Sequence, residues 1–292
     1  AVAITPDGKL AIVSAPSRYD AADKKLLLEN YVQVVDLAAS PAAVIAKLDI
    51  GHHPQALAIN RAGTLMLATT TSGNVLVFAI DGQSVTLKDT LKISDKRLAG
   101  LSITPDGKSA LVALRDEQGL MVLDIASDKV TTQRERVSTG VAPYSVDVSS
   151  TGKWALVGNV GTLAGDDDSI TLVDISKRPY RAVQHVSVGA LPEGIAISPD
   201  GRWVAVQTMN GSNLLPDNPG RQAKGRLTLF ANQNGKLVEK SSLPAGEAGQ
   251  GVVFTADGQY ILAQFNVEKQ LAVFAVANGK LKDTGKRLAS TG

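Results

Sequence analysis

The sequence predicts an all-β protein, a β-propeller built from four-stranded antiparallel blades, and three observations support this fold class. A short turn motif ending in glycine recurs six times, at intervals of about 44 to 57 residues. Between these turns lie short alternating runs rich in β-branched residues, separated by Gly, Asp, Asn and Pro. The best helical competitor, residues 21–29, lies within a single loop, and no other segment keeps a helical period between caps.

The repeated turn joins the first two strands of every unit. Its first copy reads Thr5-Pro6-Asp7-Gly8, and each type of residue has a reason to be there. Proline presets φ at the second turn position, aspartate caps the local backbone, and glycine accepts a positive φ. The six turn glycines are Gly8, Gly63, Gly107, Gly152, Gly201 and Gly258.

The unit around Gly63 shows the four strands, which we name A to D in chain order. Strand A is expected at residues 56–59, before the turn, and strand B at 65–68, after it. Strand C is expected at 74–78 and strand D at 85–93. Four antiparallel strands per repeat, arranged radially, make a propeller, so we expect residues 1–292 to form one propeller domain.

The count of turn motifs predicts six blades, or seven if a terminal blade is missing. The residues after Gly258 and those before Gly8 together make nearly one repeat. This fits a six-bladed ring closed at the chain termini, and it fits equally a seven-bladed ring without one terminal blade. The chain begins inside a strand A and without Met, so we expect that a segment upstream was removed.

Two segments carry a resemblance to a known family. Residues 189–202 read GALPEGIAISPDGR, and residues 169–175 read SITLVDI. Here the sequence resembles the YVTN-type bacterial β-propeller repeat proteins, which are related to the lactonase-like seven-bladed propellers. The Tyr-Val-Thr-Asn segment itself is not kept, and the shared residues are turn and core residues, so the resemblance implies a fold more than an activity. It also implies export, to the periplasm or out of the cell.

Composition excludes several classes of function. The 30 basic and 28 acidic residues leave a net charge of +2, and aromatic residues make up 4% of the chain. Neither value suits a nucleic-acid binder, which needs many phosphate contacts or stacking platforms. No run of 18 apolar residues is present, so we expect no membrane span. The absence of cysteine excludes disulfides and thiol catalysis, and no Gly-x-Ser-x-Gly nucleophile motif occurs.

Loop lengths indicate which end of the strands carries function. The A–B turns are short and uniform, but three B–C loops are long, at residues 16–30, 160–168 and 210–225. All three extend the same end of the blades, together with the D–A loops. Long ordered loops on a compact scaffold are usually functional, although tolerated insertion is the alternative. We therefore expect a protein partner or a small polar ligand on this loop face.

The D–A loops align on the step before strand A, and the aligned positions predict a polar channel mouth. Convergent polar groups of this kind can bind a small polar ligand, although a wet channel lined by merely solvated residues is an alternative. The candidate ligand-binding residues are Gln55, Tyr144, Glu193, Gln250, His53 and Arg97.

Three functions remain open on the sequence, and whether the chain is an enzyme is left undecided. The first is a non-enzymatic binding or scaffold propeller. The second is a lactonase-like hydrolase or isomerase, with Glu193 as base and with His53 and Arg97 positioning a small anionic substrate. The third is a propeller subunit of a periplasmic dehydrogenase. The chain has no haem-attachment motif, so we expect no cofactor of its own.

One acidic run is a weak metal candidate. Asp166, Asp167 and Asp168 supply oxygen ligands of the kind that Ca²⁺ prefers. The run lacks the alternating spacing and the final glutamate of a calcium loop. A solvated charged loop is therefore the favoured interpretation.

Overall fold

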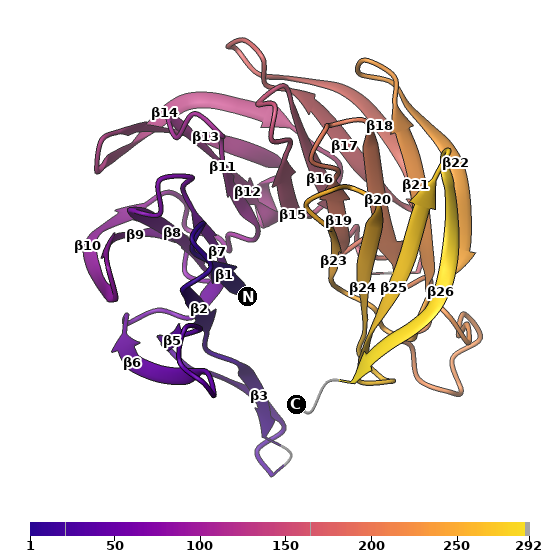
Figure 1. Cartoon of the computed structure of the whole chain (residues 1–292), viewed down its shortest axis with the longest axis horizontal. Helices are drawn as coiled ribbons and strands as arrows, with labels where there is room; N and C mark the ends of the chain where they lie inside the picture. The colour runs from indigo at the N-terminus through magenta and orange to yellow at the C-terminus, as the bar shows by residue number, and fades with distance from the viewer. Residues whose placement is uncertain (21, 164, 290–292) are drawn as a thin grey trace. The chain divides into compact units, whose positions relative to one another are not determined.

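The described residues form six antiparallel sheets of four strands each and one two-stranded hairpin (Figure 1). The computed structural model describes residues 1–20, 22–163 and 165–289. In this part of the chain the only helical element is the short 3-10 turn η1 (Arg115–Glu117). The prediction of an all-β protein made of four-stranded antiparallel blades is thereby confirmed, and six such blades are present in the described residues.

Two compact units can be distinguished, unit 1 (Ala1–Glu117 and Met121–Arg134) and unit 2 (Gln118–Leu120 and Glu135–Gly292). The first sheet contains β1 (Val2–Ile4), β2 (Leu10–Ser14), β5 (Tyr31–Asp36) and β6 (Ala43–Asp49). The second contains β7 (Pro54–Ile59), β8 (Leu65–Thr70), β9 (Asn74–Asp81) and β10 (Ser84–Lys92). The third contains β11 (Leu101–Ile103), β12 (Ser109–Leu114), β13 (Gly119–Ala126) and β14 (Lys129–Ser138).

The remaining three sheets belong to unit 2. The fourth contains β15 (Pro143–Val148), β16 (Trp154–Asn159), β17 (Asp168–Asp174) and β18 (Arg181–Gly189). The fifth contains β19 (Gly194–Ile197), β20 (Trp203–Thr208), β21 (Arg226–Asn232) and β22 (Leu237–Pro244). The sixth contains β23 (Val252–Phe254), β24 (Tyr260–Phe265), β25 (Gln270–Ala277) and β26 (Lys280–Ala289). The four strands of every sheet pair in chain order, as expected for strands A to D.

The A–B turn has the mechanism that the sequence predicts. In its first copy the Gly8 amide donates to the Thr5 carbonyl at 2.8 Å, and Gly8 has a φ of +71°. The Asp7 carboxylate accepts from the Thr5 hydroxyl at 2.6 Å and from the Lys9 amide at 3.1 Å. The same carboxylate bonds recur at Asp106, Asp200 and Asp257. A four-residue motif is thus enough to close these four A–B hairpins, while Asn60 and Ser149 accept from backbone amides in the turns at Gly63 and Gly152.

Period-two alternation places the core between neighbouring sheets. On β8, Leu65 and Leu67 pack toward the third sheet, whereas Met66 and Ala68 pack toward the first. Both faces of this strand are therefore buried along its whole length. Unit 2 repeats the arrangement on β20, where Ala205 joins one apolar cluster and the flanking valines join another. These layers hold the loop-bearing strand ends in place.

One long B–C loop is more structured than the sequence predicts. Residues 16–30 were expected as a loop, and the structure forms a hairpin there from β3 (Ser17–Asp20) and β4 (Lys25–Leu28). Leu26 and Leu28 of this hairpin are exposed. Residues 160–167 and 209–225 connect strands B and C, as expected for the other two long loops. Within the described residues, no helix has the length and apolarity to span a membrane.

Candidate functional site

The candidate residues of unit 2 converge at the D–A loops, where β15, β19 and β23 begin. The residue two positions before the candidate has a positive φ in all three of these loops, at Ala142, Leu191 and Ala248. A left-handed conformation in a residue with a side chain is uncommon and recurs here at equivalent places. The three loops therefore share one backbone geometry, which sets the course of the chain two residues before Tyr144, Glu193 and Gln250.

Glu193 and Gln250 are brought together by direct hydrogen bonding. Gln250 Nε2 donates to Glu193 Oε2 at 2.8 Å, and Asn266 Nδ2 donates to Gln250 Oε1 at 2.8 Å. The Ser145 hydroxyl, beside Tyr144, donates to the Glu193 carbonyl at 2.8 Å. A chain of polar groups thus runs from β15 through the Glu193 carboxylate to the loop after β24. Ser145 and Asn266 were not among the candidates predicted from sequence.

Glycines allow the sheets to approach closely at this point. A Cβ on Gly194 would lie 2.9 Å from the Gln250 carbonyl oxygen and 3.0 Å from Gln207 Cβ. A Cβ on Gly158 would lie 2.4 Å from the Pro192 carbonyl oxygen. Real Cβ atoms do not approach this closely, so both positions need glycine. The close approach places the Gln207 side chain next to Gly194 and the Gln250 backbone.

Gln207 is the residue that the sequence interpretation missed most clearly. It is fully buried on β20, and Nε2 donates to the Gln264 carbonyl at 3.0 Å. Its Oε1, like Thr208 Oγ1, has no hydrogen-bond partner among the described residues. A buried acceptor without a donor costs free energy, so Gln207 Oε1 favours a donor supplied by water or by another molecule. A glutamine followed by threonine at the end of an otherwise apolar strand B was the available signal.

The 209–225 loop is fastened beside this cluster by charged side chains. The Arg221 guanidinium pairs with the Glu247 carboxylate, and Lys224 pairs with Glu268 at 2.7 Å. Glu268 also accepts from the Glu247 amide at 3.0 Å. The hydroxyl of Ser212, which is buried, accepts from the Ala248 amide at 3.0 Å. The long loop is therefore an ordered wall attached to the D–A loop that carries Gln250.

The candidates of unit 1 are engaged with other partners. The Arg97 guanidinium makes two hydrogen bonds to the Asp116 carboxylate, at 2.9 and 3.0 Å. These bonds raise the pKa of Arg97 and lower that of Asp116. His53 Nδ1 lies 2.7 Å from the Glu29 carbonyl oxygen, and Gln55 lies on β7. The charge of Arg97 is therefore already compensated, whereas the sequence hypothesis has it positioning an anionic substrate.

The acidic run does not gather as a metal centre in the described structure. Asp168 Oδ2 accepts from the Leu191 amide at 2.8 Å. Burial raises the pKa of Asp168, the bond from Leu191 opposes this, and the charges of Asp166 and Asp167 raise it further. Within residues 1–20, 22–163 and 165–289, no three His, Cys, Asp or Glu side chains are arranged to hold a metal ion.

The carboxylate of a half-buried aspartate in unit 2 was also missed from the sequence. Asp147, on β15, accepts from the Ile197 amide at 2.7 Å through Oδ2 and from the Val148 amide at 2.9 Å through Oδ1. Burial raises the pKa of this carboxyl to about 6, and the two amide donors oppose that effect. The carboxylate ties β15 to the end of β19 at Ile197.

Asp147 predicts a pH dependence of stability. Because its pKa is raised from 3.8 to about 6 on folding, the folded protein binds more protons than the unfolded chain between these values. The stability from this group is present below about pH 4 and is lost as pH rises through 6, an expected loss of about 1–3 kcal/mol. Urea unfolding of the wild type and of Asp147→Asn is measured from pH 4 to 7. The difference between their free energies of unfolding should change by this amount over that range.

Asp106→Asn is the matched control for that experiment. The Thr104 hydroxyl bond lowers the pKa of Asp106, so this group acts in the opposite direction. The free energy of unfolding of the wild type, relative to that of Asp106→Asn, should not fall over the same pH range. If the difference in free energy of unfolding between the wild type and Asp147→Asn stays constant with pH, the assignment of a raised pKa to Asp147 is contradicted.

Comparison with known proteins supports the fold. No protein-family model matches the chain, and no curated protein matches it significantly. A Bacteroides fragilis structure named as a "putative 6-phosphogluconolactonase" is similar at a TM-score of 0.77 and 17% identity, over 99% of this chain and 83% of that one. The Kuenenia stuttgartiensis hydrazine synthase structure is similar at a TM-score of 0.73 and 20% identity, over 94% of this chain and 75% of that one.

A third similar structure is described as a β-propeller. It is the Cps50 (Swd1) β-propeller domain of Myceliophteria thermophila, with a TM-score of 0.70 and 14% identity, over 100% of this chain and 85% of that one. Sequence identities this low speak for the fold and not for an activity. The chain therefore has the β-propeller fold, as the turn repeats predict.

Proposed function

We propose that this chain is an exported binding propeller that takes a small, polar, hydroxyl-bearing ligand at the D–A loops of unit 2. The observation that carries the proposal is the linked polar cluster of Glu193, Gln250 and Asn266. It lies next to one buried acceptor that has no partner among the described residues, Gln207 Oε1, because Gln207 pairs with Gly194 across β19 and β20. Carboxylate and amide oxygens that converge in this way recognise a ligand rich in hydrogen-bond donors.

The ordered 209–225 loop supports binding rather than mere insertion on a permissive scaffold. Its attachment through Arg221 and Lys224 holds one side of the cluster in place before any ligand arrives. A preorganised wall lowers the entropy cost of binding. Export rests on the resemblance to YVTN-type repeat proteins and remains part of the proposal.

A panel of sugars, sugar acids and their lactones tests the proposal. Binding is measured by ligand-observed NMR on the wild type, Glu193→Gln and Glu239→Gln. Glu193→Gln is expected to weaken binding by about 10- to 100-fold, because it removes a hydrogen bond to a charged group. Glu239, exposed on β22, is the matched control and should leave binding unchanged. No binding to the wild type at millimolar concentration, or equal binding to Glu193→Gln, would refute the proposal.

A lactonase-like activity is the second candidate, because two similar structures are each described as a "putative 6-phosphogluconolactonase". Glu193 would then act as the general base. The same lactones serve as substrates, and turnover that Glu193→Gln abolishes would favour the enzyme. Binding of a lactone without its hydrolysis would favour the binding module. The engagement of Arg97 by Asp116 favours the latter.

A further inference from the structure

In unit 2, two grooves between neighbouring sheets are each filled by a tryptophan side chain. Trp154 begins β16, and its ring packs under the hairpin turn between β21 and β22. A Cβ on Gly235 of that turn would lie only 2.8 Å from Trp154 Cη2. Trp203 begins β20 and packs in the same way under the turn between β25 and β26, where a Cβ on Gly279 would lie 3.1 Å from Trp203 Cη2.

Leu10 occupies the same position in the first sheet of unit 1. The carbonyl of each of these residues accepts the bond that closes its A–B turn, from Thr5 to Leu10 at 2.9 Å and from Ser149 to Trp154 at 2.8 Å. The facing turn, between β9 and β10, contains Gly82 and Gln83. A Cβ on Gly82 would meet nothing within 4 Å. The smaller side chain of Leu10 therefore leaves space that indole rings fill in unit 2.

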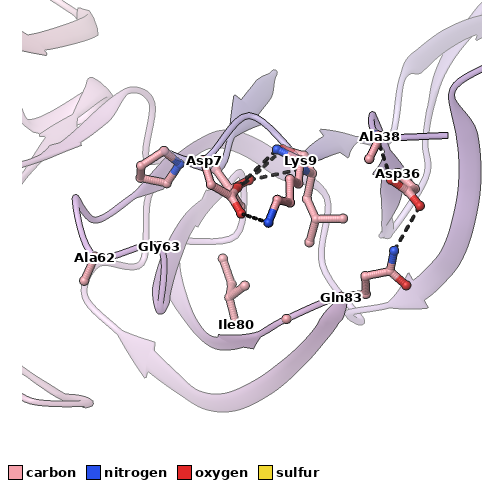
Figure 2. A pocket seen from close by; sticks show the side chains of 12 residues that line it. Asp7, Lys9, Asp36, Ala38, Ala62, Gly63, Ile80 and Gln83 are labelled. Atoms are coloured by element: carbon pink, nitrogen blue, oxygen red, sulfur yellow. Dashed lines mark hydrogen bonds and ion pairs between the residues drawn. The ribbon is translucent and has the colours of Figure 1, made fainter.

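That space is a cavity of about 460 Å³ at the A–B turn end of the first two sheets (Figure 2). This volume lies within the range of small-molecule sites. Leu10 and Ile80, both buried, give it apolar walls. Figure 2 shows Asp7 and Lys9 on one side, and Asp36 with Gln83 on another. The cavity thus combines apolar walls with a few polar groups at its edge.

The charge at the edge of the cavity is unbalanced. Lys9 Nζ lies 3.6 Å from Asp7 Oδ2, so these two charges offset each other. Asp36 accepts from Gln83 Nε2 at 2.9 Å and from the Ala38 amide at 2.8 Å, both neutral donors. In unit 2, by contrast, Lys153 lies 5.1 Å from the centre of the Trp154 ring and donates to Asn234 Oδ1 at 2.7 Å. The cavity therefore carries one excess negative charge, at Asp36.

We infer that this cavity binds a small molecule composed of a flat aromatic ring and a protonated amine. The ring takes the place that the indoles of Trp154 and Trp203 take in unit 2. The amine lies against the Asp36 carboxylate. The site is distinct from the Glu193 cluster, because it is built from turns at the opposite ends of the strands in unit 1.

Tryptamine is the probe, measured by isothermal titration calorimetry on the full chain. The wild type is expected to bind one tryptamine per chain at that site. Leu10→Trp fills the cavity as Trp154 and Trp203 fill theirs, so affinity should fall by about tenfold or more while the thermal midpoint rises. No tryptamine binding by the wild type at millimolar concentration, or equal binding by folded Leu10→Trp, would overturn the inference.

A second variant keeps the test decisive if Leu10→Trp fails to fold. Asp36→Asn should weaken the binding of tryptamine by about three- to tenfold, because it removes only the charge of the carboxylate. The affinity for neutral indole should not change. Asp174→Asn is the matched control, since Asp174 pairs with Trp154 in the same register in which Asp36 pairs with Leu10. It should change neither affinity. Equal affinity for tryptamine and indole-3-acetate, or an equal effect of both variants, would also overturn the inference.

Discussion

Replacing Gly73 by alanine is expected to lower the free energy of unfolding by about 3 kcal/mol or more. Gly73 lies in the turn between β8 and β9 and has a φ of +83°. A Cβ there would lie 2.0 Å from the Ser94 carbonyl oxygen and 2.8 Å from that of Lys96. Both neighbours are backbone atoms, so neither can move aside as a flexible side chain would. Urea unfolding monitored by circular dichroism measures the loss.

Gly82→Ala is the matched control for Gly73→Ala. Gly82 also has a positive φ, of +56°, but its Cβ would meet nothing within 4 Å. Only the conformational cost remains, about 1–2 kcal/mol. If the two variants lose the same free energy, the close approach of residues 94–96 to Gly73 does not exist in solution.

Trp154→Ala is expected to cost about 3–5 kcal/mol, the range for removing a large buried aromatic side chain. Trp154 is 7% exposed and belongs to the apolar cluster between the fourth and fifth sheets. Its ring also supports the turn at Gly235. Alanine would leave a cavity in this groove of unit 2, comparable to the one that is open beside Leu10 in unit 1. Thermal and urea unfolding both report the change.

Trp154→Phe tests whether the loss in Trp154→Ala comes from emptying the groove. Phenylalanine retains an aromatic ring in the groove, so the expected loss is about 1–2 kcal/mol. A loss below about 1 kcal/mol for Trp154→Ala would show that the indole contributes little to packing, contrary to this structure.

Much of the fold could be predicted because its determinants are local. The Asp7 carboxylate bonds within its own turn, and Gly8 supplies the positive φ that closes it. The strands around Gly63 follow from alternation, and the structure forms them at β7 to β10, extended by a few residues. The hairpin at β3 and β4 was missed, because only pairing between its two arms distinguishes it from a polar loop.

The candidate site could be predicted only in part. The contact of Glu193 with Gln250 agrees with the alignment of D–A loops, because equivalent positions of neighbouring blades come close together. The pairing of Arg97 with Asp116 was not predicted, because it depends on where η1 turns its acidic side chain. Gln207 and Asp147 were missed, because their importance comes from burial against another sheet.

The sequence by itself determined the all-β class, the four-stranded unit and the position of every A–B turn. Each of these depends on hydrogen bonds or alternation within a few residues. The tertiary structure alone decided which polar atoms are left without partners and which groove stays open. In the sequence, Leu10 is an ordinary strand residue. Only the tertiary structure shows that the turn at Gly82 and Gln83 faces it and leaves a cavity there. Such properties arise from distances between sheets, and residues far apart in the chain set those distances together.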